Sequence, residues 1–153
     1  MSKIKKRRRG TAIVETEAGI LVTAGRSKVF LLPGGGANKG ESRVKAAMRE
    51  LTEETGLKPY YAKYLFRHVG KVHKSHGHGY FRDHHTVCLI KTHGTPRPRH
   101  EIRYVAFYKP GSGVRISGVT REIIQRYYNY KKHGKAKQRQ MSLIDRFLEW
   151  LGF

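Results

Sequence analysis

Short runs of β-branched and aromatic residues, separated by turns that contain glycine or proline, predict a series of β-strands along the chain. The expected strands are residues 11–16, 20–24, 29–32, 60–72, 80–91 and 101–108. The segments 71–79 and 92–100 are rich in histidine, glycine and basic residues, and we expect them to be loops.

A different spacing predicts a helix that begins near Glu41 and ends at Gly56, just before Pro59. Its apolar positions recur at i, i+3, i+4 and i+7, and they are Val44, Ala47, Met48 and Leu51. This spacing puts the four side chains on one side of the helix, so we expect that side to face the core.

Two more helices are expected near the C-terminal end. One spans residues 120–130, with Thr120 as its N-cap and Ile123, Ile124 and Tyr127 on one side. A basic linker over 131–140 follows, and then a short amphipathic helix over 142–151. The apolar positions of this last helix are Leu143, Ile144, Phe147, Leu148, Trp150 and Leu151. The order of strands and helices predicts an α/β fold with a mixed sheet.

The first helix also carries Glu50, Glu53 and Glu54 on one side, where like charges repel one another. A divalent cation bound to these carboxylates would offset the repulsion. A solvated acidic surface is the alternative, but the chain has only 11 acidic residues against 32 Lys and Arg, and its net charge is +21. The surrounding positive surface favours polyanionic partners, such as nucleotides, inositol phosphates, RNA, DNA or acidic lipid surfaces.

Length and composition predict one domain over residues 10–153, preceded by a basic arm over residues 1–9. The arm is either a solvated terminus or a segment that binds nucleic acid. The single cysteine, Cys88, lies in an apolar run and is expected to be buried and reduced. No apolar run is long enough to cross a membrane, and the basic N-terminus lacks the apolar core of a signal peptide, so we expect a cytoplasmic protein.

The stretch from Gly35 to Leu57 resembles the Nudix box at every fixed position. Gly35 is followed after five residues by Glu41, and after seven more by Arg49-Glu50-Leu51-Thr52-Glu53-Glu54-Thr55-Gly56-Leu57. The lead-in Leu-Leu-Pro-Gly-Gly-Gly also resembles the entry to that box. The resemblance implies an α/β/α sandwich with a mixed β-sheet and hydrolysis of a nucleoside diphosphate linked to another group.

The resemblance also implies roles for individual residues. Mg²⁺ or Mn²⁺ would be held by the metal ligands, which are Gly34 (through its carbonyl), Glu50, Glu53 and Glu54. Arg49 and Glu41 would form a pair that orients the loop against the helix. The general base is left open between Glu50 and Glu101, and a surface salt bridge with Arg99 or Arg103 is the alternative role for Glu101.

Basic and aromatic residues outside the box are candidates for contacts with substrate. We expect Arg67, Tyr80, Arg82 and Arg103 to line the mouth of the pocket, with burial in the strands as the alternative for the aromatic residue. The function predicted is a metal-dependent pyrophosphohydrolase of a nucleoside diphosphate-linked or other polyphosphate substrate, with the 5′ end of RNA as one candidate. The alternative is a nucleotide sensor or nucleic-acid-binding regulator without turnover, and a homodimer is one alternative to a monomer.

Overall fold

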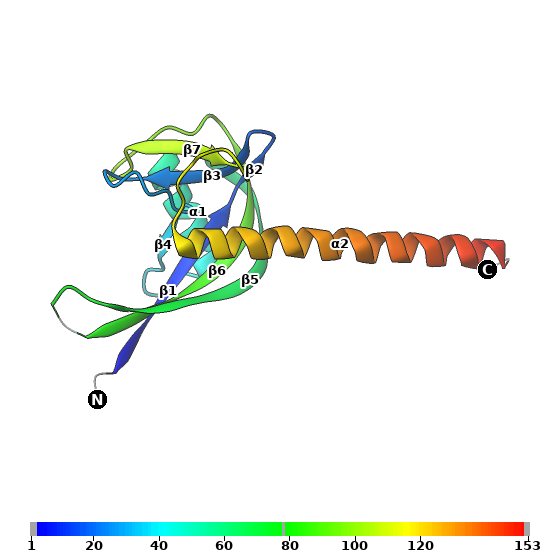
Figure 1. Ribbon diagram of the computed structural model, residues 1–153, viewed down its shortest axis with the longest axis horizontal. Helices are drawn as coiled ribbons and strands as arrows, with labels where there is room; N and C mark the ends of the chain where they lie inside the picture. Colours follow the sequence, from blue (N-terminus) through cyan, green and yellow to red (C-terminus); the bar gives the residue numbers. More distant parts are fainter. Residues whose placement is uncertain (1–2, 78, 152–153) are drawn as a thin grey trace. The chain divides into compact units, whose positions relative to one another are not determined.

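The computed structural model describes residues 3–77 and 79–151, and for residues 136–146, 149 and 150 it describes the backbone alone. These described residues form two sheets and two helices (Figure 1). The four-stranded sheet has the order β4 (Gly34–Gly36), β1 (Ile4–Ile13), β6 (Tyr80–His93) and β5 (Lys58–Lys74). The three-stranded sheet has the order β2 (Glu15–Thr16), β3 (Gly19–Ala24) and β7 (Tyr104–Tyr108). The helices are α1 (Arg43–Thr55) and α2 (Gly118–Trp150).

The larger sheet is mixed, because β1 and β6 run parallel while the other neighbouring strands are antiparallel. This confirms the expected α/β fold with a mixed sheet. By their contacts, the residues form two compact units, Met1–Thr120 and Arg121–Phe153, and the pocket described below lies in the first.

Helix α1 covers the core of the first unit. Ser42 caps it, because the Ser42 hydroxyl accepts a hydrogen bond from the Lys45 N–H at 3.1 Å, and Gly56 ends it in the left-handed conformation. The predicted apolar stripe is confirmed. Its four residues belong to the core or pack against it, and the buried core is Ala12, Val14, Leu21, Ala47, Leu51, Leu57, Cys88 and Ile90.

The basic arm is a strand from residue 4 onward, and its side chains stay exposed from Ile4 to Arg8. This segment is the first half of β1 and pairs in parallel with β6, in register from Ile4 opposite Tyr80 to Arg9 opposite His85. Charged side chains are compatible with this strand because lysine and arginine extend their head groups into water. The structure does not describe residues 1 and 2.

The glycine run also differs from the expectation. Residues 29–32 form only isolated bridges, and the strand at this point is β4, whose three glycines pair with β1. Gly34 shows why small residues are needed, since a Cβ there would collide with the carbonyl oxygen of Gly10 and lie 3.0 Å from the Cα of Thr11. The three glycines of β4 have no side chains, and this allows the strand to lie against β1.

The β5–β6 hairpin is longer than expected, because residues 71–74 belong to β5. The expected loop over 71–79 is thus shortened, and its His78 lies outside the described residues. Strand β7 begins at Tyr104 instead of residue 101, because residues 100 and 101 form a turn.

The expected linker over 131–140 is wrong, since α2 is one continuous helix through this segment. Lysine, arginine, glutamine and alanine are good helix formers, and the single Gly134 costs only about 1 kcal/mol relative to alanine. The cap also differs, because the Thr120 N–H donates to the hydroxyl of Ser117 at 3.2 Å.

The side chains of Ile123, Ile124 and Tyr127 are buried, as expected. Phe147, Leu148 and Leu151 are exposed, whereas the side chains of the other apolar residues expected in the last helix (Leu143, Ile144 and Trp150) lie outside the described residues. Within the described part of the chain, no helix combines the length and apolarity needed to span a membrane.

Candidate active site

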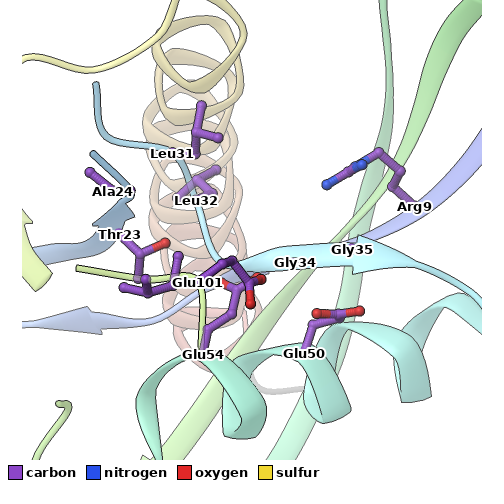
Figure 2. Close-up of a pocket in the computed structure, with 12 residues that line it drawn as sticks. Arg9, Thr23, Ala24, Leu31, Leu32, Gly34, Gly35, Glu50, Glu54 and Glu101 are labelled. Carbon is purple, nitrogen blue, oxygen red and sulfur yellow. The ribbon is translucent and has the colours of Figure 1, made fainter. Parts of the chain in front are cut away.

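A pocket of about 460 Å³ opens where β4 meets helix α1 (Figure 2). Its size is within the range of small-molecule binding sites. Glu50 and Glu54 reach it from one side of α1 because they are four residues apart. The full lining is Arg9, Thr23, Ala24, Gly25, Leu31, Leu32, Gly34, Gly35, Glu50, Glu54, Glu101 and Ile102.

The glycines of β4 allow the loop to approach the acidic side of α1 closely. A Cβ on Gly35 would lie 2.5 Å from Oε1 and 2.8 Å from Cγ of Glu50. Both distances are shorter than any normal contact, so a side chain at position 35 would displace the Glu50 carboxylate.

Arg49 joins the loop before α1 to the helix. Its guanidinium donates two hydrogen bonds to Glu41, from Nε at 2.9 Å and from Nη2 at 3.0 Å, and Nη2 also donates to the Gly36 carbonyl at 3.1 Å. Nη1 donates to Glu50 at 3.1 Å and to Glu53 at 3.2 Å. The expected Arg49–Glu41 pair is therefore present. Hydrogen bonds from Arg49 lower the pKa of the Glu41 carboxyl to about 2, so this pair stays ionised at neutral pH.

Glu54 is the most deeply buried of the helix carboxylates, with 6% of the residue exposed. Its Oε2 has no hydrogen-bond partner among the described residues, which is a costly arrangement for a buried polar atom. Burial, followed by the charges of Glu50 and Glu101, raises the pKa of Glu54 to about 8. The three acidic side chains thus lie close together in a strongly basic protein, and their repulsion favours the protonated form of Glu54.

This arrangement fits a divalent cation. Carboxylate oxygens are the ligands that Mg²⁺ and Mn²⁺ prefer, and a cation would satisfy the orphaned oxygen of Glu54 and reduce the repulsion among the three acids. The ligand set is not preassembled, because within the described residues no three His, Cys, Asp or Glu side chains already converge on one point. Glu53, with 48% of its side chain exposed, bonds to Arg49 and does not line the pocket.

The remaining predicted residues divide into two groups. Glu101 lies in the pocket wall, and in the described part of the chain it forms no ion pair with Arg99 or Arg103. The four expected substrate contacts are not in the pocket lining, so their role stays a prediction. They are Arg67 on β5, Tyr80 and Arg82 on β6, and Arg103, which directly follows the lining residue Ile102.

Arg9 is the one charged residue of the described lining that was not expected from the sequence, because it was assigned to the arm. It extends toward the carboxylates from β1 (Figure 2). A signal was present: residues 5–9 run into the expected strand at Thr11 with Gly10 as the only interruption. A cation at this position can contact the phosphates of a substrate beside the acidic cluster.

Comparison with known proteins agrees with this site. The family model for the NUDIX domain matches residues 5–127. A protein from Chromobacterium violaceum that is assigned to the Nudix hydrolase family is 34% identical, with 94% of this chain and 92% of that chain covered and a TM-score of 0.67. The chain therefore belongs to the Nudix family of hydrolases, which act on phosphoric anhydride bonds.

More distant structures share the fold. One is the MutT Nudix hydrolase of Burkholderia pseudomallei, which is 20% identical and has a TM-score of 0.63. The match covers 79% of this chain and 97% of that chain. An ADP-ribose pyrophosphatase of Streptococcus suis has 18% identity, covers 74% of this chain and 81% of that chain, and has a TM-score of 0.52. Comparison with curated proteins gave no significant match.

Proposed function

We propose that this protein is a Mg²⁺- or Mn²⁺-dependent pyrophosphohydrolase. It cleaves a diphosphate linkage in a nucleoside diphosphate-linked or other polyphosphate substrate by attack of water at phosphorus. The observation that carries the proposal is the buried, unpartnered oxygen of Glu54 beside Glu50 and Glu101, in a pocket that also contains Arg9. Carboxylates for a cation and a guanidinium for phosphate are the two charges that phosphoryl transfer requires.

The residues have separate tasks in this reaction. Glu50, Glu54 and the carbonyl of Gly34 would hold the cation, and Glu53 would join them when it leaves Arg49. A cation held there would neutralise charge on the phosphoryl oxygens and lower the pKa of the water bound to it. Arg9 contacts a phosphate oxygen of the substrate.

A carboxylate takes the proton of the attacking water, and Glu50 and Glu101 are the candidates because both face the pocket. Arg49 acts indirectly, since it holds the loop at Gly36 and Glu41 against the helix that carries the ligands. This positioning keeps the acidic residues at fixed separations.

The activities for which distant structural relatives are named guide the choice of substrates to test. A panel should contain ADP-ribose, a nucleoside diphosphate sugar, nucleoside triphosphates, a dinucleoside polyphosphate and an RNA with a 5′-triphosphate. Product release is measured with Mg²⁺ or Mn²⁺, and again with excess chelator. We expect wild-type protein to hydrolyse at least one member of the panel, and chelator to abolish that activity.

Two variants test the assignment of residues. Glu54→Gln should reduce kcat/KM by roughly 100-fold or more, because it removes the buried charge that the cation requires. Glu17→Gln, a neutralised acid in the exposed turn between β2 and β3, is the matched control and should retain full activity. Equal activity of wild type and Glu54→Gln on every hydrolysed substrate would sink the assignment, as would undiminished activity in chelator.

A further inference from the structure

The start of β1 lies beside the outer part of the β5–β6 hairpin (Figure 1). Basic residues of these segments carry positive charge that the catalytic pocket does not use. Alternation along β1 puts Lys6 and Arg8 on the same side as Gly10. At Gly10 this side is covered by α1, because a Cβ there would lie 2.5 Å from the backbone N of Ala47. Helix α1 begins at this point, and beyond it Lys6 and Arg8 are exposed.

The neighbouring strands add basic residues on the same side. Register pairs Lys6 with Arg82 and Arg8 with His84, and it places Arg67 of β5 opposite Thr86, the partner of Gly10. Partners in register project from the same side of a sheet. We call this set of residues the cationic face, and it consists of Lys6, Arg8, Arg67, Arg82 and His84, with Arg43 at the start of α1.

Lys6 and His84 of the cationic face are surrounded by positive charge. Partial desolvation and then the charges of Arg67, Arg8 and Arg43 lower the pKa of Lys6, so the main charges that act on Lys6 are all positive. Desolvation and then Lys6, Arg67, Arg82 and Arg8 lower the pKa of His84 in the same way.

The one acid on this part of β6, Asp83, points to the opposite side and is engaged by Arg7, with Nε–Oδ1 at 2.7 Å and Nη2–Oδ2 at 2.9 Å. On the cationic face, Arg82 Nε and His84 Nδ1 are buried and have no hydrogen-bond partner among the described residues. The Arg82 N–H is a donor without an acceptor, crowded by like charges, and such a group is suited to an anionic ligand.

The shape of the cationic face favours a chain of phosphates over a single phosphate group. Lys6 and Arg8 are two residues apart on one strand, which corresponds to about 6.6 Å, and the rows on neighbouring strands are about 4.8 Å apart. Tyr80, with 41% of the residue exposed, lies on the same side beside Ile4 and offers a ring for stacking. Basic rows combined with an exposed aromatic ring are typical of surfaces that bind single-stranded nucleic acid.

We propose that the cationic face is a binding site for single-stranded nucleic acid, separate from the catalytic pocket. Basic side chains contact successive phosphates, and Tyr80 stacks on a base. The proposal goes beyond hydrolysis, and it also gives a role to Arg67, Tyr80 and Arg82, which the pocket leaves unused.

The test compares two full-length triple variants of equal charge. Lys6→Gln/Arg8→Gln/Arg82→Gln removes three charges from the cationic face, whereas Arg26→Gln/Lys58→Gln/Lys109→Gln removes three exposed charges elsewhere. Fluorescence anisotropy measures binding of a labelled 16-nucleotide single strand with a 5′-hydroxyl, at several salt concentrations and without divalent metal. This strand has no diphosphate linkage, so the result does not depend on the proposed hydrolysis.

Wild type should bind with a strong salt dependence. The cationic-face variant should bind at least about 10-fold more weakly at low salt, and its log–log salt slope should fall by about 2, because each lost contact to a single strand removes about 0.7. The control variant should stay within about threefold of wild type. Equal weakening of the two variants would overturn the proposal, because binding would then follow net charge and not location.

Two further measurements test whether the triple variant is folded and whether the ligand is a nucleic acid or another polyanion. If circular dichroism shows that the triple variant is unfolded, the exposed single changes Lys6→Glu and Arg8→Glu replace it, with Lys58→Glu as their control. Each of the two should lower the log–log salt slope by at least about 0.7 and weaken binding more than the control does, and equal weakening of all three variants would overturn the proposal. Tyr80→Ala should weaken binding of the oligonucleotide but not of long-chain inorganic polyphosphate. If Tyr80→Ala leaves both unchanged and polyphosphate binds as tightly as the oligonucleotide, the assignment to nucleic acid is wrong.

Discussion

The close approach of Gly35 to Glu50 makes a specific prediction about catalysis. In Gly35→Ala, the new Cβ would lie 2.5 Å from Oε1 of Glu50, which falls short of an ordinary 3.4 Å contact by about 0.9 Å. The backbone of β4 is held by its pairing with β1, so the Glu50 side chain has to give way. We therefore expect the Glu50 carboxylate to move by roughly 1 Å.

A displacement of this size should affect activity much more than stability. A misplacement of about 1 Å can reduce the rate by roughly 100-fold, and we expect kcat/KM to fall by about 10- to 100-fold, equivalent to about 1.4–2.7 kcal/mol. Glu50 is the far end of a flexible side chain, so the free energy of unfolding should change by less than about 1 kcal/mol. Both quantities are measured on the same preparation, by product release from the best substrate and by urea unfolding.

Gly36→Ala is the matched control, since a Cβ on the neighbouring residue meets no atom within 4 Å. This variant should keep wild-type activity and stability. If Gly35→Ala retains kcat/KM within twofold of wild type, the position of Glu50 does not limit the reaction, and the reasoning from the loop geometry is refuted.

Three further changes test other parts of the structure. Gly10→Ala puts a Cβ 2.5 Å from the backbone N of Ala47, and a backbone atom cannot rotate away. The free energy of unfolding should therefore fall by about 1–3 kcal/mol in urea titrations. An unchanged midpoint would contradict this packing. In Arg49→Lys the bidentate contact with Glu41 cannot form. NMR titration should show the pKa of Glu41 rising from about 2 toward 4.5, and activity should fall. An unchanged pKa would show that Arg49 does not cause the low pKa of Glu41. Burial and then the charge of Arg9 lower the pKa of His85 from 6.5 to about 4. The neutral imidazole therefore contributes fully to stability above pH 6.5, and this contribution is lost as the pH falls toward 4. The loss in the free energy of unfolding is at most about 3 kcal/mol. His85→Gln should flatten the pH dependence of unfolding in this window, and an unchanged profile would exclude the role of His85.

Local patterns were sufficient for the helix that carries the chemistry. Its hydrogen bonds join residues four apart, so the apolar stripe of α1 and the acidic side of the helix both follow from short-range spacing. The pair between Arg49 and Glu41 could also be anticipated, because both residues lie within the same short stretch. Burial of Cys88 followed in the same way from its apolar neighbours.

Local patterns failed where the partner is distant in sequence or the signal is weak. The basic segment at residues 4–9 lacks the alternation of a half-buried strand, and only its pairing with β6, more than 70 residues later, makes it part of the sheet. The interruption expected in α2 rested on a basic composition that is in fact compatible with a helix. Strand β4 was missed because glycine is generally unfavourable in strands. Here glycine is needed because the backbone of β4 lies very close to that of β1.

The sequence by itself determined the family, the helix with its glutamates and the glycine turn before it, because these depend on residues within about 25 positions of one another. The tertiary structure decided which acids face the pocket, since Glu53 turns to Arg49 while Glu101 approaches from a distant loop. It also brought Arg9 to the pocket and left Lys6 and Arg8 on an open surface. These placements depend on the parallel register of β1 with β6, and a register between strands so far apart is set by packing of the whole sheet, which short-range spacing does not encode.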